Sequence, residues 1–548
     1  MAKSRREDYH SWTHDDVFPA KLKKLSFGDI FGLFLGFLYD WTGRVRKDEM
    51  GTLPNNAVDL ARRIVDDQES VVLEADGDTA SSVLETWIFQ TQAKYTGDKR
   101  ADISDPFLSL KPVHVDMSRI WPSQYSSDSR VGLQRLYFSL LAYDEKGDLD
   151  LGILEDVRGF FSESSAAKIG AFSRIVLSLS SLPAISEQEM RRVRDENKEV
   201  MRQESSPPLC RPHARMFRDD LKHIMAYRDS LSHVELMEWL YSCICFHLAT
   251  YTLRTAIALR HMMEDAFVAL EAPAGQSDAK QAPPNCRDCP GIDECPFKPQ
   301  IPVSSSFDPH QQDISLEPFA AFVSVHKGII LEHPAYLSTL GRLREAAEGS
   351  ASLAGLVLPH EFVREYKSNK AFRGKTDKLL LVQVRDYIDR VSDIITPAYA
   401  DTLKSAVSAN PALCLRIFKE AVRLYYAGVG SRYDSTAQVW SFYKAAAGKE
   451  GAFFLSQKTK DRPDFYLLSV DFLTVMAHIM LAMNPSARIT DFLHFMKERG
   501  IVLDSSQGRN QLADLITNLQ DMGMYVKMSD DVSAQFVYPL YQLRRNES

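Results

Sequence analysis

Three of the seven cysteines lie within ten residues of a proline-rich loop. They are Cys286, Cys289 and Cys295, spaced C-x2-C-x5-C, and a proline follows the second and the third. Thiolates two residues apart can bind one metal ion, and the prolines restrict the loop that presents them. Because surface loops seldom carry clustered unpaired thiols, this group predicts a cysteine-ligated metal or iron–sulfur site.

The spacing resembles the three-cysteine half of the four-iron–four-sulfur sites in the AddB and Cas4 nuclease families. Those sites take a fourth cysteine from far upstream, and the resemblance makes Cys210 the candidate here. It therefore implies a 4Fe-4S cluster, with zinc as the alternative, because tetrahedral sulfur ligation suits both. The nuclease motif that accompanies the cluster in those families is not located in this sequence, so no catalytic residue is assigned.

A helical hairpin separates Cys210 from the cysteine loop. Apolar residues recur at helical spacing over about 214–230 and 234–270, with a break at Ser232 and His233. A hairpin returns the chain toward its start, which favours a meeting of Cys210 with the loop. A Cys3His zinc site that uses His213 is the competing ligand set.

A second segment has residue types suited to nucleic acid. It carries six basic residues in fifteen: Arg364, Lys367, Lys370, Arg373, Lys375 and Lys378. Tyr366 and Phe372 lie between them, and basic residues interleaved with aromatic ones suit phosphate contact and base stacking. The alternative is a solvated helix face.

The C-terminal 80 residues have the element order of a winged helix-turn-helix. Three helices are predicted, at Asp471–Met483, Ile489–Arg499 and Gln511–Asp521, and a β-hairpin follows over 524–538. The segment leading into the third helix exposes Arg509 as a candidate DNA contact. That helix also carries acidic residues, so contact with DNA and contact with a partner protein both stay open.

Together these patterns predict a mainly α-helical, multidomain protein with a cysteine-ligated metal loop and a C-terminal winged helix. The composition, 45% hydrophobic and 25% charged in 548 residues, is that of a globular protein with several domains. The expected divisions are a mixed α/β domain over 1–165, a helical hairpin domain with the metal loop over 166–315, a helical domain over 316–470, and the winged helix over 471–548.

Charge and hydropathy constrain the setting. The net charge of −8 excludes a strongly basic whole-chain field, so any nucleic-acid contact must come from a local patch. The apolar run Ile30–Tyr39 is too short to span a bilayer and is predicted to be a buried helix. We therefore expect a cytoplasmic protein with no membrane contact.

A second family resemblance rests on the C-terminal stretch. The segments Asp491–Asp504 and Met528–Val537 are similar to the end of DptG-type proteins, which are components of phosphorothioation-dependent restriction systems. Methylation-associated defence systems have similar components. The resemblance implies a non-catalytic scaffold or DNA-binding subunit of an anti-phage complex, acting with an ATPase or helicase partner. An iron–sulfur nuclease-like enzyme acting on DNA is the alternative.

Overall fold

The protein is described here from a computed structural model. The structure describes residues 18, 27–43, 61–62, 65–66, 114–119, 132–162, 185–272, 291, 294–303, 317–347, 353, 358–428, 435–448, 454–455, 464–503, 511–527 and 535–541. Cys286, Cys289 and Arg509, together with most of the predicted mixed α/β region, lie outside these residues.

The described residues are mainly helical, as predicted. The helices of the first half are α2 (Phe27–Asp40), η3 (Val115–Arg119), α6 (Leu133–Leu141), α7 (Gly152–Phe161), α9 (Glu187–Glu204), α10 (Arg211–Met225) and α11 (His233–Glu271). The helices of the second half are α12 (Glu317–Ala347), α13 (Pro359–Ser368), α14 (Lys370–Ile395), α15 (Pro397–Ala409), η5 (Pro411–Leu413), α16 (Cys414–Gly428), α17 (Ser435–Ala447), α18 (Val470–Met483), α19 (Ile489–Glu498) and α20 (Gln511–Asp521).

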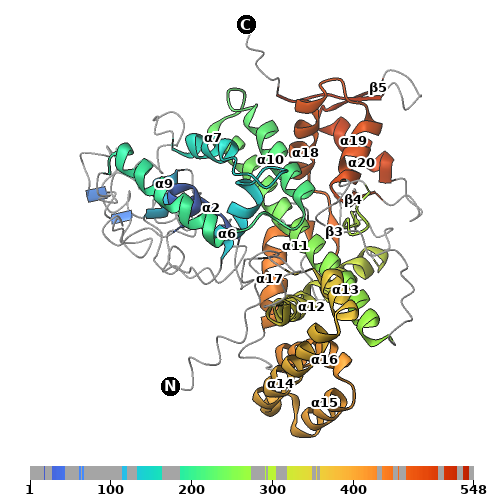
Figure 1. Ribbon diagram of the computed structural model, residues 1–548. Helices are drawn as coiled ribbons and strands as arrows, with labels where there is room; N and C mark the ends of the chain where they lie inside the picture. The colour runs from blue at the N-terminus through green and yellow to red at the C-terminus, as the bar shows by residue number, and fades with distance from the viewer. Residues whose placement is uncertain are drawn as a thin grey trace.

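Helix α11 is the central element of the fold. Ser232 caps its N-terminus in a capping box with Glu235, which satisfies backbone amides that the first turn leaves unpaired. The helix packs against α10, α12, α13, α17 and α18, so it joins the N-terminal helices to the C-terminal ones (Figure 1). By length and composition alone α11 could cross a membrane, but 89% of its most apolar window is buried inside the protein.

The apolar run that the sequence places in a buried helix is α2. Its described side chains are buried, and Tyr137 on α6 donates a hydrogen bond to the carbonyl oxygen of Ile30 at 3.0 Å. Asp40 ends the helix and accepts bonds from the backbone of Thr42 and Gly43. This run is therefore part of the protein core.

The strands that the structure describes are short and pair in twos. They are β1 (Ile301–Pro302), β2 (Phe454–Leu455), β3 (Tyr466–Leu467), β4 (Ile501–Val502), β5 (Tyr525–Lys527) and β6 (Gln535–Val537). The β2–β3 and β5–β6 pairs are antiparallel, whereas β1 and β4 pair in parallel. The β1–β4 pair joins the segment after the cysteine loop to the C-terminal region.

The C-terminal elements follow the predicted order of three helices and a hairpin. The hairpin is β5–β6, which packs against α20, and β6 also bridges to Arg488 just before α19. In one respect the arrangement departs from a simple winged helix, because β4 pairs with β1 rather than with the hairpin. The assignment as a winged helix stays a prediction.

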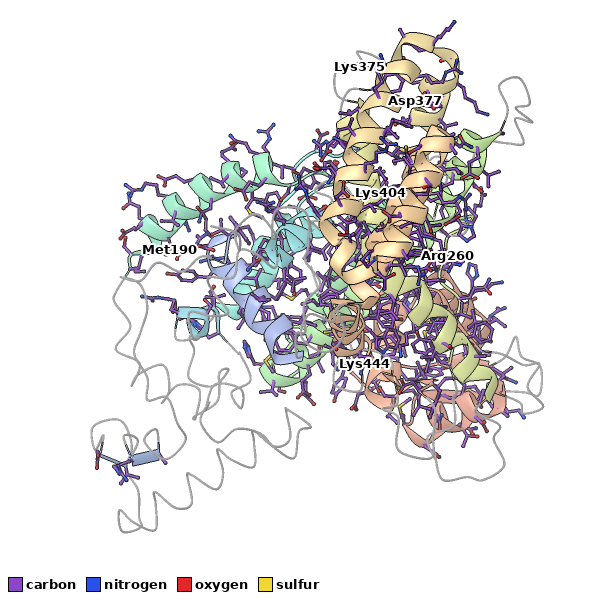
Figure 2. All side chains as sticks on the ribbon, turned by 90° about the horizontal axis from the view of Figure 1, so that it is seen from below. Met190, Arg260, Lys375, Asp377, Lys404 and Lys444 are labelled. Atoms are coloured by element: carbon purple, nitrogen blue, oxygen red, sulfur yellow. The ribbon has the colours of Figure 1, made fainter. Side chains whose placement is uncertain are left out.

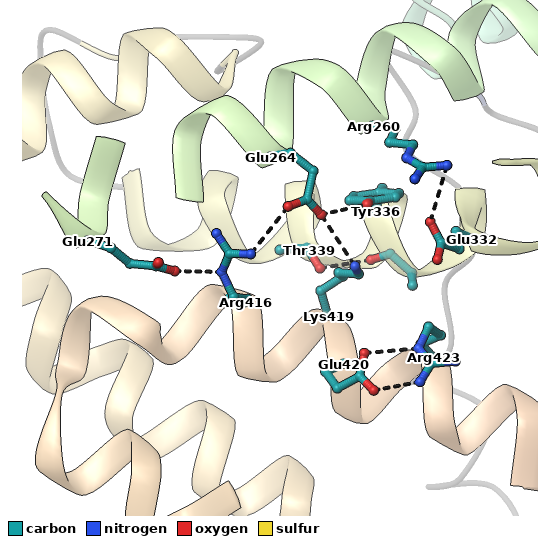
Figure 3. Close-up of polar contacts among 11 residues, drawn as sticks. Arg260, Glu264, Glu271, Glu332, Tyr336, Thr339, Arg416, Lys419, Glu420 and Arg423 are labelled. Carbon is teal, nitrogen blue, oxygen red and sulfur yellow. Dashed lines mark hydrogen bonds and ion pairs between the residues drawn. The ribbon is translucent and has the colours of Figure 1, made fainter. Parts of the chain in front are cut away.

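Helices α12 to α16 pack together and form what we call the α12–α16 lobe, of which α14 to α16 lie at the lower end of the molecule in Figure 1. Polar contacts tie this lobe to α11 (Figure 3). Glu264 on α11 accepts bonds from the Tyr336 hydroxyl of α12 at 2.7 Å and from Lys419 of α16 at 3.3 Å. Arg416 bridges Glu264 and Glu271. One carboxylate thus joins three helices.

Candidate metal centre and basic face

Cys210 lies at the N-cap of α10, where the chain enters the hairpin. Pro207 and Pro208 precede it, and Pro212 occupies the first turn of the helix, which suits the fixed φ of proline. The thiol is buried, with 9% of the residue exposed. The sequence pattern of prolines around Cys210 thus creates a fixed, internal position for its sulfur.

Cys295, which follows the α10–α11 hairpin in the sequence, lies at the same cavity as Cys210. One cavity is lined by Leu209, Cys210, Arg254, Thr255, Ala258, Cys295 and Phe297. Cys295 is half-buried and Phe297 is buried. The structure therefore brings together the two described members of the predicted ligand set, which are 85 residues apart in the sequence.

Pairing with the C-terminal region holds the segment after Cys295 in place. The amide of Ile301 donates to Gly500 at 2.7 Å, and the amide of Val303 donates to Val502 at 3.1 Å. Gly500 has φ +85°, and a Cβ there would meet the carbonyl oxygen of Pro299 at 2.6 Å. Only glycine permits this close approach of the two backbones.

Arg254 is the charged side chain of the cavity, and sequence reasoning missed it. It lies in the apolar helix α11 with 2% of the residue exposed. Its Nη1 donates to the Cys210 sulfur at 3.9 Å, and its buried Nε has no hydrogen-bond partner among the described residues. An arginine within an otherwise apolar helical stretch was the available signal, because such a charge needs a partner.

His213, the alternative zinc ligand, belongs to a buried network beside the cavity. It is fully buried, and its Nε2 lies 3.2 Å from the carbonyl oxygen of His247. Burial, with Arg254 and His247 nearby, holds the pKa of His213 well below its usual value, so the ring is neutral. Its Nδ1 has no partner among the described residues. His213 is not among the residues that line the cavity.

The same network contains an ion pair that joins the hairpin to the C-terminal region. His247 Nε2 lies 3.0 Å from the Asp220 carboxylate, which also accepts from Arg499 Nε at 3.0 Å. Burial alone would raise the pKa of Asp220, but Arg499 and His247 outweigh it and lower that pKa to about 2. The carboxylate is therefore ionised and fully paired, and its role is structural.

The described part of the chain contains no group of three or more His, Cys, Asp or Glu side chains arranged to hold a metal ion. Cys286 and Cys289, the other two predicted ligands, are outside that part. Cys243 and Cys245 are fully buried on α11. Burial raises the pKa of both thiols, which favours the protonated form.

The basic segment spans the junction of α13 and α14. Asn369 is both the C-cap of α13 and the N-cap of α14, where its side chain accepts from the amide of Phe372 at 3.0 Å. Lys375 lies at the projecting end of this pair of helices (Figure 2). Four of the six basic residues are exposed and two are half-buried. None forms an ion pair with another described residue.

The two interleaved aromatic residues are not available for base stacking. Tyr366 and Phe372 are each only 8% exposed, and both pack against Phe362. The Tyr366 hydroxyl donates to Asp377, and burial, followed by that contact, raises the pKa of the tyrosine. The segment therefore offers charge without an aromatic platform, and the expectation of stacking is wrong for these rings.

The fold described above is that of a mainly helical protein. Comparison with known families shows the class of protein: it is a component of an anti-phage defence system. The chain belongs to the family described as methylation-associated defense system protein MAD7, whose model matches residues 9–317 of the 548. No curated protein matches the sequence. The matched region contains the four predicted cysteine ligands and Arg254. The DptG-like resemblance rests on C-terminal residues outside it.

Proposed function

We propose that this chain is a non-catalytic scaffold subunit of its defence system that contacts DNA through the α13–α14 junction. It acts in the cytoplasm beside an ATPase or helicase partner. Membership in the defence family supports action in a multi-component system. The continuous packing around α11 supports a scaffold, because it links the N-terminal helices, the α12–α16 lobe and the C-terminal hairpin region.

The observation that carries the DNA contact is the unpaired charge at the α13–α14 junction. Elsewhere on the surface, many basic side chains form ion pairs. Arg191 and Arg192 on α9 pair with glutamates four residues away, and Lys404 pairs with Asp389. The six basic residues of residues 364–378 have no such partner among the described residues. Their charges are therefore available to phosphates.

A chain with a net charge of −8 repels DNA at long range. Binding must therefore come from a local surface that neutralises phosphates and releases counterions. Each phosphate contact lowers the slope of log K against log salt by about 0.9 for duplex DNA. The proposed contact is with phosphates, which carry no sequence information directly, so we expect binding with little preference for base sequence.

The test is fluorescence anisotropy of labelled duplex DNA at two salt concentrations. The variant K367Q/K370Q/R373Q/K375Q should bind more weakly and with a salt dependence flatter by about 3 to 4 units of slope if all four side chains contact phosphates. The control R191Q/R192Q/K198Q/R202Q removes the same charge from exposed α9. Figures 1 and 2 both place α9 away from α14.

Equal affinity and salt slope for the wild type and the α14 variant would show that the junction is a solvated helix face. A loss as large in the α9 control would show a general charge effect and no site. The same samples, incubated with Mg²⁺ or Mn²⁺, test the alternative of a nuclease-like enzyme, because cleavage of the DNA by the isolated protein would contradict a non-catalytic role.

A further inference from the structure

The cavity beside the N-cap of α10 contains a buried positive charge that has no carboxylate partner among the described residues. The guanidinium of Arg254 brings a full positive charge into the core. A buried charge is costly unless it is paired. Its hydrogen-bond partner among the described residues is the sulfur of Cys210, at 3.9 Å.

The four other buried arginines of the described residues are each paired with a carboxylate. Arg119, Arg194, Arg218 and Arg499 are each at most 6% exposed. Each forms an ion pair with a carboxylate, namely Asp116, Glu187, Asp150 and Asp220 in that order. Arg254, the most buried of the five in the described residues, is the one that has no carboxylate partner there.

The cavity lining offers sulfur in place of a carboxylate. Two thiols, Cys210 and Cys295, face it together with Arg254, and the remaining lining residues are apolar except for Thr255. The Thr255 hydroxyl already donates to the carbonyl oxygen of Tyr251 at 2.9 Å. A neutral thiol pair cannot balance a guanidinium, whereas thiolates bound to a metal carry net negative charge.

We infer that this cavity holds an anionic metal centre bound by the thiolates of Cys210 and Cys295, with Arg254 as its buried counter-charge. The centre is a zinc–thiolate site or an iron–sulfur cluster, and Cys286 and Cys289 are the further ligands that the sequence predicts. Binding releases the thiol protons to solvent, and the metal replaces them on sulfur. This inference does not depend on DNA binding.

Such a centre would join parts of the chain that are remote in sequence. Cys210 begins α10, while Cys295 precedes β1, which pairs with β4 of the C-terminal region. A metal bound between the two sulfurs therefore fastens the hairpin to the strand pair. Its binding free energy would contribute to folding, as in other structural metal sites.

The decisive experiment is metal analysis of the full chain, purified without oxygen from cells supplied with iron and zinc. We expect about four irons with a broad visible absorbance, or about one zinc, per chain. C210S and C295S should each lower the metal content several-fold. C243S changes a fully buried thiol that does not line the cavity, and it should keep the metal.

Two additional variants test the role of Arg254 and the ligand set. R254Q should lose metal to a chelator several-fold faster and, for an iron centre, should show a lower reduction potential, because the nearby positive charge favours the reduced cluster. H213Q should keep the metal if four cysteines bind it, and should lose the metal if zinc is held by three cysteines and this histidine.

Wild-type protein with neither metal at stoichiometric level would overturn the inference. Full metal content in both C210S and C295S would also overturn it. If the serine variants do not fold, X-ray absorption of the wild type decides, because the centre requires a metal–sulfur shell at about 2.3 Å. A spectrum with only nitrogen and oxygen neighbours contradicts it.

Discussion

Arg499, just after α19, pairs with Asp220 on α10 across 279 positions of sequence. Asp220 is fully buried and Arg499 is 4% exposed, and the guanidinium also lies 3.4 Å above the ring centre of Phe495. Because His247 contacts the same carboxylate, one buried anion holds together α10, α11 and the C-terminal region. The pair is a buried polar link between the α10–α11 hairpin and the predicted winged helix.

The first prediction is that breaking this pair destabilises the protein more than replacing it. R499M leaves the Asp220 carboxylate buried with one partner fewer and should cost about 3 to 5 kcal/mol in the free energy of unfolding. D220N should cost a similar amount. The double variant D220N/R499M should cost less than the sum of the two. Urea unfolding followed by circular dichroism measures this, with E199Q, at a glutamate on α9 whose side chain is 58% exposed, as a surface control.

Additive losses in the double variant would show that the two residues act independently. The contact would then be a consequence of packing and not a source of stability.

This pair also shows why the helices could be predicted from the sequence more easily than the contacts of the candidate site. Helices α10, α11 and α18 to α20 follow from local periodicity and from breaks such as the Ser232 cap, which depend on neighbouring residues. The partner of Asp220 depends on tertiary packing, and no local pattern encodes it. That Cys210 and Cys295 line one cavity was accessible only in part: a hairpin returns the chain, but α11 has 39 residues and α10 has 15, so the hairpin alone does not bring the chain back to Cys210. The identity of the metal was not, because zinc and iron–sulfur sites share ligands.

The error over the aromatic residues has a local cause. Phe362 and Tyr366 are four residues apart and so lie on one face of α13, and Phe372 lies beside Phe362. That spacing indicates a buried face, with the basic residues on the opposite side. Composition alone gave the charges and the rings equal weight, whereas helical periodicity separates them.

The second prediction concerns stability against pH. Burial lowers the pKa of His326 to about 4, of His333 to about 3 and of His478 to about 4. In the unfolded chain these rings titrate near 6.5. Below that pH the unfolded state therefore binds more protons than the folded state. The free energy of unfolding is highest above pH 6.5 and falls as the pH drops toward the pKa values of the folded state. We expect a loss of about 1 kcal/mol per histidine between pH 7.5 and 5.5.

His478 provides the specific test of this pH dependence. Its Nε2 accepts bonds from the backbone amides of Leu540 and Tyr541, at 3.1 and 3.3 Å, and protonation would remove that acceptor. H478Q should be less stable at pH 7.5 but should lose less stability on acidification. H494Q, at a side chain 67% exposed, should behave as the wild type. Equal pH dependence in all three proteins would contradict a role for His478.

The third prediction is that Glu264 stabilises the attachment of the α12–α16 lobe. Burial would raise its pKa, but contacts with Tyr336, Lys419 and Arg416 outweigh this and lower it. The side chain is 35% exposed, so screening limits the effect, and E264Q should cost about 1 kcal/mol. E420Q removes a carboxylate whose partner, Arg423, is on the same helix (Figure 3), and should cost less. The urea midpoint compares them, and an equal cost contradicts the prediction.

The last prediction concerns Asn369, which is the cap residue shared by the two helices of the basic junction. Its side-chain oxygen accepts a hydrogen bond from the backbone amide of Phe372, and its side-chain nitrogen donates to the Glu365 carboxylate at 2.8 Å. N369A removes an N-cap and should lower stability by about 1 kcal/mol. It removes no charge, so the number of phosphate contacts, and hence the salt slope of DNA binding, should stay near the wild-type value while affinity falls several-fold. N369D restores the capping oxygen but loses the bond to Glu365 and places a second carboxylate beside it, so it should regain only part of the stability. The new negative charge among the six basic side chains should weaken DNA binding further. Anisotropy and urea unfolding on the same preparations separate the effect on DNA binding from the effect on stability.

If N369D binds DNA as tightly as the wild type, phosphates do not approach the junction, and the DNA contact must lie elsewhere on the chain.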